Sequence, residues 1–448
     1  MKLNSSRFNT DWNDKVLSEL GTFARGKSKH RPRNDPKLFS DGNYPLVQTG
    51  DVTEASFVIS NHTAAYNEFG LKQSKLWPTG TLCITIAANI AETALLGYPM
   101  CFPDSVVGFS ADAEETSEVF MHYVFTYIRN AIQKSVSGSI QDNINIEYLT
   151  NLKFKIPSLP EQQGIETVLS ALDTKIELNN RINAELETLA KTIYDYWFVQ
   201  FDFPDAKGRP YKTSGGKMVW NEALKRAIPE EWAVGDISAV AAILGGATPS
   251  KADLDYWDGD IPFFTPTDAS GDVFQLQTED SITQAGLDSC SSDLFVKGTV
   301  FITARGSVGK ISIAGRPMAM NQSCYALAPK IAANYPYVFL HGKTLIHHLK
   351  VKASGSTFNS IVTNDIEWTQ LISPDPEVIS AFCKVVMPLF DRIEAAQHEN
   401  HELGQLRDWL LPLLMNGQVK PSGLPLSALG PFLAAASTQR VVCEEAGC

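Results

Sequence analysis

The run FITARGSVGKIS, residues 301–312, holds two glycines and a lysine in the order that phosphate-binding loops use. Such a loop needs Gly-x-x-x-x-Gly-Lys-Ser/Thr, because the glycines let backbone N–H groups reach the phosphates and the last hydroxyl holds magnesium. Here Ala304 stands where the first glycine belongs, and Ile311 stands where the hydroxyl belongs. The spacing therefore predicts a strand, a turn and a second strand, with Gly306 and Gly309 at positive φ, and no nucleotide loop.

Other combinations of reactive side chains fail on type or spacing. His398 and His401 stand three apart on a predicted helix, where surface residues are commoner than metal ligands. The words PD (103–104) and DTK (173–175) can be aligned with a nuclease motif, but they lie far apart and the second falls on a long predicted helix. No Gly-x-Ser-x-Gly, His-Glu-x-x-His or Cys-x-x-Cys occurs. The sequence predicts no catalytic residue, no metal site and no cofactor in this chain.

One loop is strongly basic in a chain of formal net charge −12. The run RGKSKHRPRNDPK, residues 25–37, has six Lys or Arg, one His and one Asp. Such a cluster is typical of contact with nucleic-acid phosphates, and arginine also matches the O6 and N7 atoms of guanine. A solvated surface loop is the alternative. The candidate DNA-binding residues of this loop are Arg25, Lys27, Lys29, His30, Arg31 and Arg33.

The chain contains an internal repeat with an offset of 217 to 220 residues. The matching pairs of segments are 42–52 with 259–269, 80–92 with 298–310, 135–144 with 352–361 and 145–149 with 365–369. In this alignment the segment Arg305–Lys310 corresponds to Ala87–Glu92, which has neither glycine nor lysine. The turn therefore differs between two copies of one scaffold, as a recognition loop would.

Each copy is followed by a long helical stretch with one apolar seam. Between residues 160 and 198 apolar side chains recur at alternating steps of three and four, and the phase is kept when 217 is added. An Asn in such a seam fixes the register, because a misaligned partner leaves its amide unpaired. We expect the two helices to pack on each other; the alternative is that each packs on its own module. The predicted seam residues are Ile176, Asn183, Leu186, Ile393, Asn400 and Leu403.

The predicted fold is mixed α/β, with two pseudo-repeated globular modules separated by two long antiparallel coiled-coil helices. The predicted parts are a first module at 1–157, a central helix at 158–200, a linker with at most one helical turn at 201–228, a second module at 229–373, a C-terminal helix at 374–417 and a disordered tail at 418–448. No apolar run approaches the roughly 20 residues of a membrane span. The first residues lack the apolar centre of a signal peptide, which predicts a cytoplasmic protein.

Several longer words resemble the specificity subunits of type I restriction-modification systems. They are GGATPSKADLDYWDGDIPFFTPTD (245–268), GTVFITARGSVGKISIAGRPMAMNQSC (298–324), ARGKSKHRPRND (24–35) and the helical run 159–198. The resemblance covers roughly residues 10–418 and implies two target-recognition domains that each read one half of a split double-stranded DNA site. The antiparallel helices would then act as the spacer between them.

The resemblance also implies partners and further DNA contacts. Two modification (methyltransferase) subunits would dock on the helices, with restriction (endonuclease and translocase) subunits beyond them, and these partners would use S-adenosylmethionine, ATP and magnesium. The further candidate DNA-binding residues are Gln141, Asn143, Thr248, Ser250, Lys251, Arg305, Ser307, Lys310 and Asn359. Two other interpretations stay open: a protein-binding scaffold without DNA specificity, and an unrelated two-domain enzyme with a site between the repeats.

Overall fold

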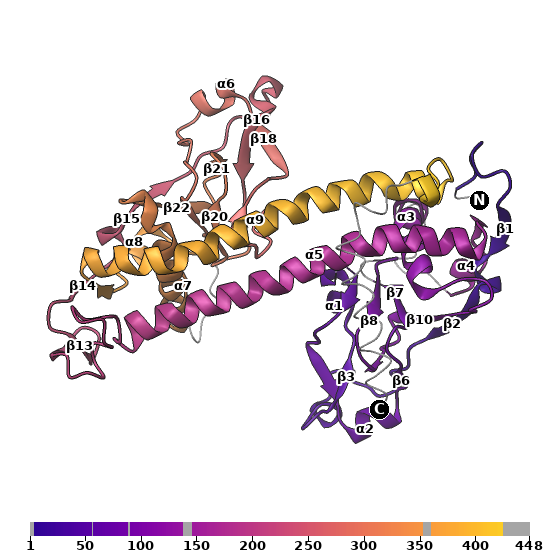
Figure 1. Cartoon of the computed structure of the whole chain (residues 1–448), viewed down its shortest axis with the longest axis horizontal. Helices are drawn as coiled ribbons and strands as arrows, with labels where there is room; N and C mark the ends of the chain where they lie inside the picture. Colours follow the sequence, from indigo (N-terminus) through magenta and orange to yellow (C-terminus); the bar gives the residue numbers. More distant parts are fainter. Residues whose placement is uncertain (1–3, 56, 88–89, 138–145, 353–359, 424–448) are drawn as a thin grey trace. The chain divides into compact units, whose positions relative to one another are not determined.

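The computed structural model describes residues 4–55, 57–87, 90–137, 146–352 and 360–423 (Figure 1). The chain forms two compact units. Unit 1 comprises Met1–Leu178 and Asn400–Cys448, and unit 2 comprises Asn179–Glu399. Each unit contains one α/β module together with one half of each of two long helices, α5 (Leu159–Tyr194) and α9 (Pro376–Met415).

The module of unit 1 is built on a five-stranded sheet in the order β2-β10-β7-β8-β4. Its strands are β2 (Gly21–Arg25), β10 (Val106–Ala111), β7 (Leu82–Thr85), β8 (Thr93–Leu96) and β4 (Val58–Ile59). The other strands are β5 (Ala64–Tyr66), β3 (Tyr44–Leu46), β9 (Met100–Cys101) and β6 (Leu76–Trp77), which form a second sheet, and the pair β1 (Asn13–Val16) and β11 (Lys153–Ile156). The helices are α1 (Thr49–Glu54), α2 (Glu68–Lys72), α3 (Glu118–Ser137) and α4 (Ile146–Thr150).

The module of unit 2 repeats this plan with a five-stranded sheet in the order β15-β22-β19-β20-β17. Its strands are β15 (Ala241–Gly245), β22 (Cys324–Pro329), β19 (Val300–Thr303), β20 (Ile311–Ala314) and β17 (Phe274–Gln275). The other strands are β18 (Asp280–Ile282), β16 (Trp257–Phe264) and β21 (Ala319–Met320), and the pair β14 (Ala233–Gly235) and β23 (Leu371–Ser373). The helices are α6 (Gln284–Asp288), α7 (Tyr335–Lys352) and α8 (Thr363–Glu367).

Strand register shows that the two modules share one scaffold. Ile84 of β7 lies opposite Thr93 of β8, and Ile302 of β19 lies opposite Ile311 of β20. Both members of the second pair stand 218 residues after those of the first. The two strands that the sequence predicts on either side of the turn at Gly306 and Gly309 are present as β19 and β20.

In each unit, apolar side chains of the five-stranded sheet and of the helices form an extended hydrophobic cluster. In unit 1, Phe120 and Val124 of α3 pack with Leu172 of α5 and Leu414 of α9 against the five-stranded sheet. Each such side chain contributes about 1.5–3 kcal/mol when it is fully buried. In unit 2 the equivalent core centres on an aromatic cluster in which the Phe198 ring lies 5.1 Å from that of Phe382. Because the apolar seams of both helices are buried in these clusters, apolar residues recur along each helix with the heptad spacing seen in the sequence.

The long helices pack against each other in antiparallel fashion within both units. In unit 1, Asp173 of α5 accepts a hydrogen bond from Arg407 of α9. In unit 2, Asn179 donates to Glu399 at 2.8 Å, and further along α5 the Tyr194 ring contacts Phe382. The residue numbers of the contacting positions on α9 therefore decrease as those on α5 increase, as antiparallel helices require. Helix α9 begins at Pro376, whose missing N–H is not needed in a first turn, and Asp375 caps the N–H of Glu377.

The predicted seam residues lie in these packed regions. Ile393 and Ile176 are buried, and Leu186 and Leu403 are half-buried against the cores of units 2 and 1 respectively. Asn183 is buried as well, and its Oδ1 atom has no hydrogen-bond partner among the described residues. Asn400 is half-buried.

The segment predicted as a linker, residues 201–228, contains no helical turn. A β-hairpin lies there instead, formed by β12 (Met218–Asn221) and β13 (Arg226–Pro229). Asn221 Oδ1 accepts hydrogen bonds from the backbone N–H groups of Ala223 and Leu224, and Lys225 adopts φ 51°. The Asn221 side chain therefore stabilises the tight turn of the hairpin, which the helix propensities of the segment do not predict. In the predicted tail, residues 418–423 include a short 3-10 turn, Pro421–Gly423, and residues 424–448 lie outside the described part.

Candidate nucleic-acid interface

Several loops meet at one end of the five-stranded sheet in each module. In unit 2, β15 ends at Gly245 opposite Tyr325, near the start of β22, and β19 ends at Thr303 opposite Cys324. Because neighbouring strands are antiparallel, the segment that leaves β15, the turn after β19 and the segment before β22 emerge side by side. The three segments are residues 246–251, 304–310 and 320–323, and we call this region the loop end of unit 2.

Backbone contacts fix these loops to one another. The N–H of Ala247 donates to the carbonyl of Met320 at 3.1 Å, and the N–H groups of Ala304 and Arg305 both donate to the carbonyl of Ser323. A Cβ atom on Gly246 would lie 2.2 Å from the Met320 carbonyl oxygen, so only glycine allows the first segment to approach this closely. The loops are therefore held by backbone geometry, which leaves their side chains free to vary.

Unit 1 has the same arrangement at the same end of its sheet. Strand β2 ends at Arg25, and the N–H of Gly26 donates to the carbonyl of Val106 at 2.9 Å. A Cβ atom on Gly26 would lie 2.1 Å from the Pro103 carbonyl oxygen, which matches the requirement at Gly246. The basic loop 25–37 therefore occupies in unit 1 the place that residues 246–251 occupy in unit 2, and we call this region the loop end of unit 1.

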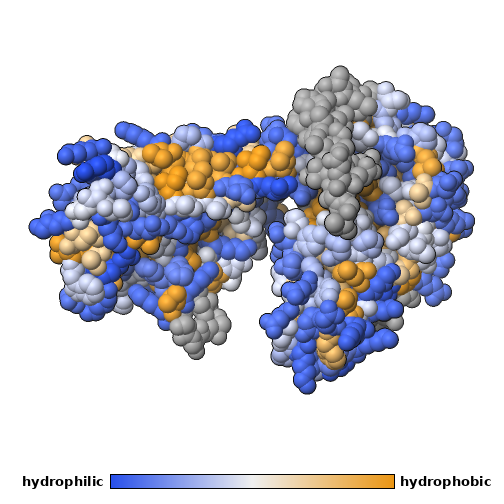
Figure 2. All heavy atoms as spheres, turned by 60° about the horizontal axis from the view of Figure 1, so that its bottom comes forward, coloured by the Kyte–Doolittle hydropathy of each residue, from blue (hydrophilic) through white to orange (hydrophobic). Residues whose placement is uncertain are grey.

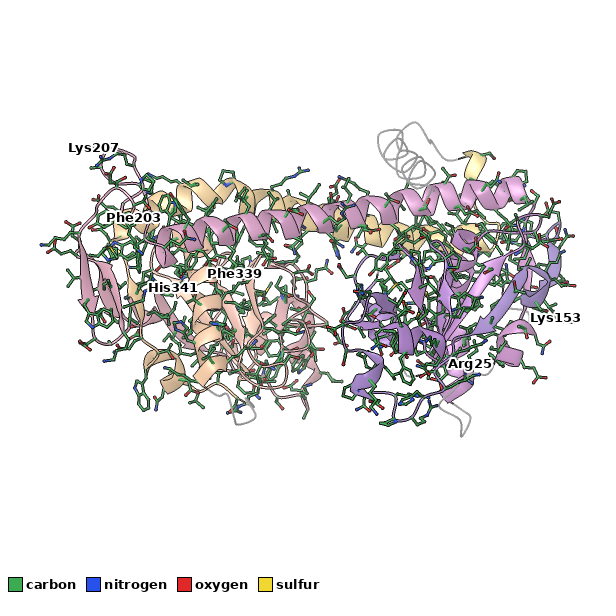
Figure 3. The ribbon with its side chains drawn as sticks, turned by 90° about the horizontal axis from the view of Figure 1, so that it is seen from below. Arg25, Lys153, Phe203, Lys207, Phe339 and His341 are labelled. Carbon is green, nitrogen blue, oxygen red and sulfur yellow. The ribbon has the colours of Figure 1, made fainter. Side chains whose placement is uncertain are left out.

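Asp104 organises the arginines of the basic loop. Its Oδ2 atom lies 2.6 Å from Nη2 of Arg33 and 3.5 Å from Nη2 of Arg31. Its backbone carbonyl accepts a hydrogen bond from Nε of Arg25, which Figure 3 labels. The sequence did not indicate that Asp104 belongs to this cluster, because the Pro-Asp pair at 103–104 was compared only with a nuclease motif. The arginines are therefore positioned by a carboxylate that also neutralises part of their charge.

The remaining basic residues of the loop behave differently. His30 pairs with Asp35 at 2.8 Å, and the pKa of Asp35 is lowered by the backbone N–H of Lys37 and by the His30 ring. Lys27 and Lys29 are exposed, and among the described residues their ammonium groups have no hydrogen-bond or ion-pair partner. These two lysines are the side chains of the loop that are most available to an external anion.

The structure places the candidate residues of unit 2 at its loop end as well. Thr248 donates to the Oε1 atom of Gln322, and Lys251 lies over the Trp257 ring at 5.6 Å. The remaining members of the set are exposed: Ser250, Arg305, Ser307 and Lys310. Gln141, Asn143 and Asn359 lie outside the described residues.

Gln322 is a further candidate that the sequence analysis did not select. Its exposed side chain lies beside the 246–251 segment because Thr248 bonds it, although the two residues are far apart in sequence. A glutamine amide can pair with both N6 and N7 of adenine. The only available signal was its place in the word MNQSC, which does not reveal the contact with Thr248.

Within the described residues, no helix is long and apolar enough to cross a membrane, and no three His, Cys, Asp or Glu side chains gather as a metal site would require.

This combination of two repeated α/β modules and two long antiparallel helices agrees with the comparisons to known proteins. Residues 9–188 and 229–403 match the family described as "Type I restriction modification DNA specificity domain". Since the two stretches include both modules and most of both helices, the chain belongs to this family.

Individual relatives agree with the assignment. The chain is 26% identical to the HindI specificity subunit of Haemophilus influenzae over 356 residues, which cover 68% of this chain and 75% of that one. It is 24% identical to the MjaIX specificity subunit of Methanocaldococcus jannaschii, over 92% of this chain and 94% of the relative. The crystal structure of a type I restriction-modification S subunit from M. genitalium has a similar fold, with a TM-score of 0.55, 16% identity and coverage of 92% and 99%.

Proposed function

We propose that this chain is the DNA-reading, non-catalytic subunit of a type I restriction-modification complex, and that each module recognises one half of a bipartite double-stranded target. The observation that carries the proposal is the duplicated loop end. In both units the same end of the same sheet presents polar or basic side chains on loops that the backbone holds in place.

The loop ends supply the two kinds of contact that DNA recognition needs. Lys27 and Lys29 offer cations to phosphates, which give affinity without sequence information. Arginines and the amide of Gln322 can read base edges in the major groove. The net charge of −12 is compatible with this role, because phosphate contact needs only local basic groups.

The long helices are the proposed docking surface for the modification subunits. Trp409 of α9 is 62% exposed, and Leu406 of α9 and Leu189 of α5 are exposed as well. Figure 2 shows hydrophobic surface gathered in a band over the long helices. Exposed apolar area of this kind is typical of protein interfaces. Two methyltransferase subunits using S-adenosylmethionine would bind there, and restriction subunits using ATP and magnesium would join the assembly.

The test is adenine-methylation sequencing of DNA from cells that express this chain together with a type I modification subunit. The proposal predicts methylation at a split motif, with two short defined blocks around an unspecified gap. Absence of new methylation, when the complex is shown to assemble, would favour a protein-binding scaffold without DNA specificity.

A further inference from the structure

Two arginines at the loop end of unit 1 share one carboxylate. Asp104 Oδ2 lies 2.6 Å from Nη2 of Arg33 and 3.5 Å from Nη2 of Arg31. Both arginine side chains are 56% exposed, so exposure alone does not separate an arginine that holds the loop from one that reads DNA. The hydrogen bonds of the two guanidinium groups do separate them.

Arg31 is bonded to the backbone of its own loop. Its Nη1 atom donates to the carbonyl of Ser28 at 2.6 Å and to the carbonyl of His30 at 2.8 Å. These two bonds use both hydrogens of Nη1, and Asp104 lies on the side of Nη2. Arg31 therefore closes the loop on itself and has few donors left for another molecule.

Arg33 has one partner among the described residues, the carboxylate of Asp104. That bond uses one of the five N–H groups of the guanidinium and leaves one edge with two parallel donors. Guanine presents O6 and N7 in the major groove as two acceptors for such an edge. Because a charge-assisted bond is about twice as strong as a neutral one, Asp104 holds this edge in a defined direction before DNA binds.

Arg25, at the end of β2, is supported in another way. Its Nε atom donates to the backbone carbonyl of Asp104. This acceptor is a neutral group, and a change of the Asp104 side chain leaves it in place. Variants of Asp104 therefore act on Arg33 and Arg31 but not on the support of Arg25.

The second oxygen of Asp104 adds an independent observation. Oδ1 is buried and has no hydrogen-bond partner among the described residues. A buried acceptor without a partner is unfavourable for folding, and each one in a native protein calls for an explanation. The contact with Arg33 supplies one, because a carboxylate that orients a recognition side chain need not stabilise the fold.

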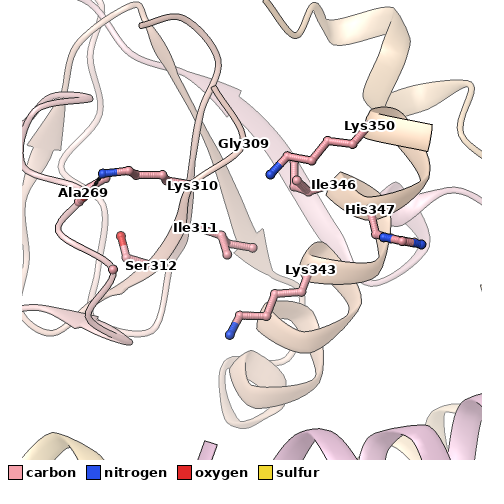
Figure 4. A pocket seen from close by; sticks show the side chains of 10 residues that line it. Ala269, Gly309, Lys310, Ile311, Ser312, Lys343, Ile346, His347 and Lys350 are labelled. Atoms are coloured by element: carbon pink, nitrogen blue, oxygen red, sulfur yellow. Dashed lines mark hydrogen bonds between the residues drawn. The ribbon is translucent and has the colours of Figure 1, made fainter. Parts of the chain in front are cut away.

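Unit 2 has the equivalent contact between loops with different chemistry. Strands β15 and β22 pair as β2 and β10 do, and the side chains that join the neighbouring loops are Thr248 and Gln322. Lys310, after β19, donates to the Ala269 carbonyl at 2.6 Å, and Figure 4 shows it directed away from the helix that carries Lys343. The contact between loops therefore holds an amide in unit 2 and a guanidinium in unit 1.

We propose that Arg33 reads a guanine in the half-site of unit 1, with Asp104 as the residue that positions it and Arg31 as the residue that holds the loop. The inference rests on the proposed function and makes it more specific, because it assigns one base type of one half-site to one side chain. A change of Arg33 that keeps its charge should alter the sequence that is read and spare the affinity for phosphates.

The first experiment compares Arg33→Lys with Arg31→Lys in the full chain assembled with modification subunits. The two variants have the same net charge, and methylated motifs are mapped by sequencing. Arg33→Lys should relax one guanine position in one block, with discrimination reduced about tenfold or more, because lysine lacks the planar fork. Arg31→Lys should keep the motif and lower binding to all sequences alike.

Asp104→Asn tests the positioning role. The variant keeps the size of the side chain and removes a negative charge beside the arginines. Discrimination at the same guanine should fall roughly fivefold, while affinity for random duplex should be equal to that of wild type or higher. The melting temperature should not fall, because Oδ1 has no hydrogen bond to lose. A loss of affinity for target and random duplexes alike would reduce Asp104 to a structural residue of the loop.

A guanine analogue with carbon in place of N7 tests direct contact at that position. Wild type should bind the modified duplex about tenfold more weakly than the unmodified one, and Arg33→Ala should bind both alike. Arg25→Ala should still distinguish the two duplexes. The opposite pattern, with the distinction lost in Arg25→Ala and kept in Arg33→Ala, would make Arg25 the reader and overturn the inference.

The inference is also overturned if the half-site that exchange of residues 1–157 assigns to unit 1 contains no guanine, or if Arg33→Lys keeps the wild-type motif. Failure of the proposed function has a different signature, in which the assembled wild-type complex methylates no defined motif. In that case the assignment of Arg33 fails together with the function.

Discussion

The two units build the same helix pairing from different chemistry. In unit 1, Asp173 of α5 is buried and bonded by Arg407 of α9 at 2.8 Å and by the Tyr123 hydroxyl at 2.7 Å. In unit 2 the positions related by the 217-residue offset are Phe390 and Ala190, which are both buried and apolar. At equivalent positions the first repeat therefore has an ion pair and the second has apolar side chains. The two repeats share the backbone fold and the pairing register of the helices, whereas their side-chain interactions differ.

The largest predicted effect is a loss of stability when the ion pair between Asp173 and Arg407 is removed. Arg407→Ala leaves the Asp173 carboxylate buried without its charge partner, and we expect unit 1 to lose about 3–5 kcal/mol of stability. Urea unfolding followed by hydrogen exchange reports the two units separately. The triple change Tyr123→Phe, Asp173→Leu and Arg407→Met mimics the apolar solution of unit 2 and should recover most of the loss. If Arg407→Ala were as stable as wild type, the ion pair would not contribute to the packing of α5 against α9 in unit 1.

The second prediction concerns the loop ends. Lys27→Glu with Lys29→Glu reverses the charge of two exposed lysines of the basic loop whose ammonium groups have no partner among the described residues, and DNA affinity of the assembled complex should fall on the order of a hundredfold at low salt. Lys153→Glu, a single charge reversal on the separate β1–β11 sheet, is the control and should have little effect; Lys27→Glu alone, with the same change in net charge, should already weaken binding. Electrophoretic mobility shift against target and random duplexes measures both. Equal affinity of the double variant and wild type would favour the scaffold interpretation.

The third prediction concerns a buried histidine that is present in each unit. Burial lowers the pKa of His122 and of His341, each from 6.5 to about 3, so both are neutral in the folded protein. The unfolded chain takes up protons between these values, so their contribution is complete above pH 6.5 and is lost as pH falls toward 3. At pH 5 each histidine should lower stability by about 2 kcal/mol relative to neutral pH.

Melting temperature measured against pH checks this expectation. His122→Gln should flatten the profile of unit 1 and His341→Gln that of unit 2, whereas His398→Gln, at an exposed site, should change neither. An unchanged slope in both buried variants would contradict the assignment of acid sensitivity to these side chains.

The smallest predicted effect sharpens the comparison of base reading. Gln322→Ala should cost about 1 kcal/mol of discrimination at a single base position of one half-site, the lower end for a base-reading amide, because Thr248 already bonds its amide oxygen. Methylation sequencing should then show a relaxed base in one block and an unchanged second block. Relaxation in both blocks, or in neither, would remove Gln322 from the set of base readers.

Much of the fold could be predicted from the sequence because it depends on local periodicity and on the repeat. The seams of α5 and α9 and the strands on either side of Gly306 and Gly309 are examples; both glycines have positive φ, as predicted. The Asp104 cluster and the Thr248–Gln322 contact were not predictable, because they join segments far apart in sequence. The hairpin after α5 was missed because a single Asn221 side chain stabilises its turn.

The most direct test of two independent half-site readers is an exchange of modules. Residues 1–157 are replaced by the corresponding region of a relative with a different target, and methylated motifs are mapped in cells that also express the modification subunit. The account predicts that one block of the split motif changes while the other block and the gap are kept. A change in both blocks, or the unchanged original motif, would contradict it.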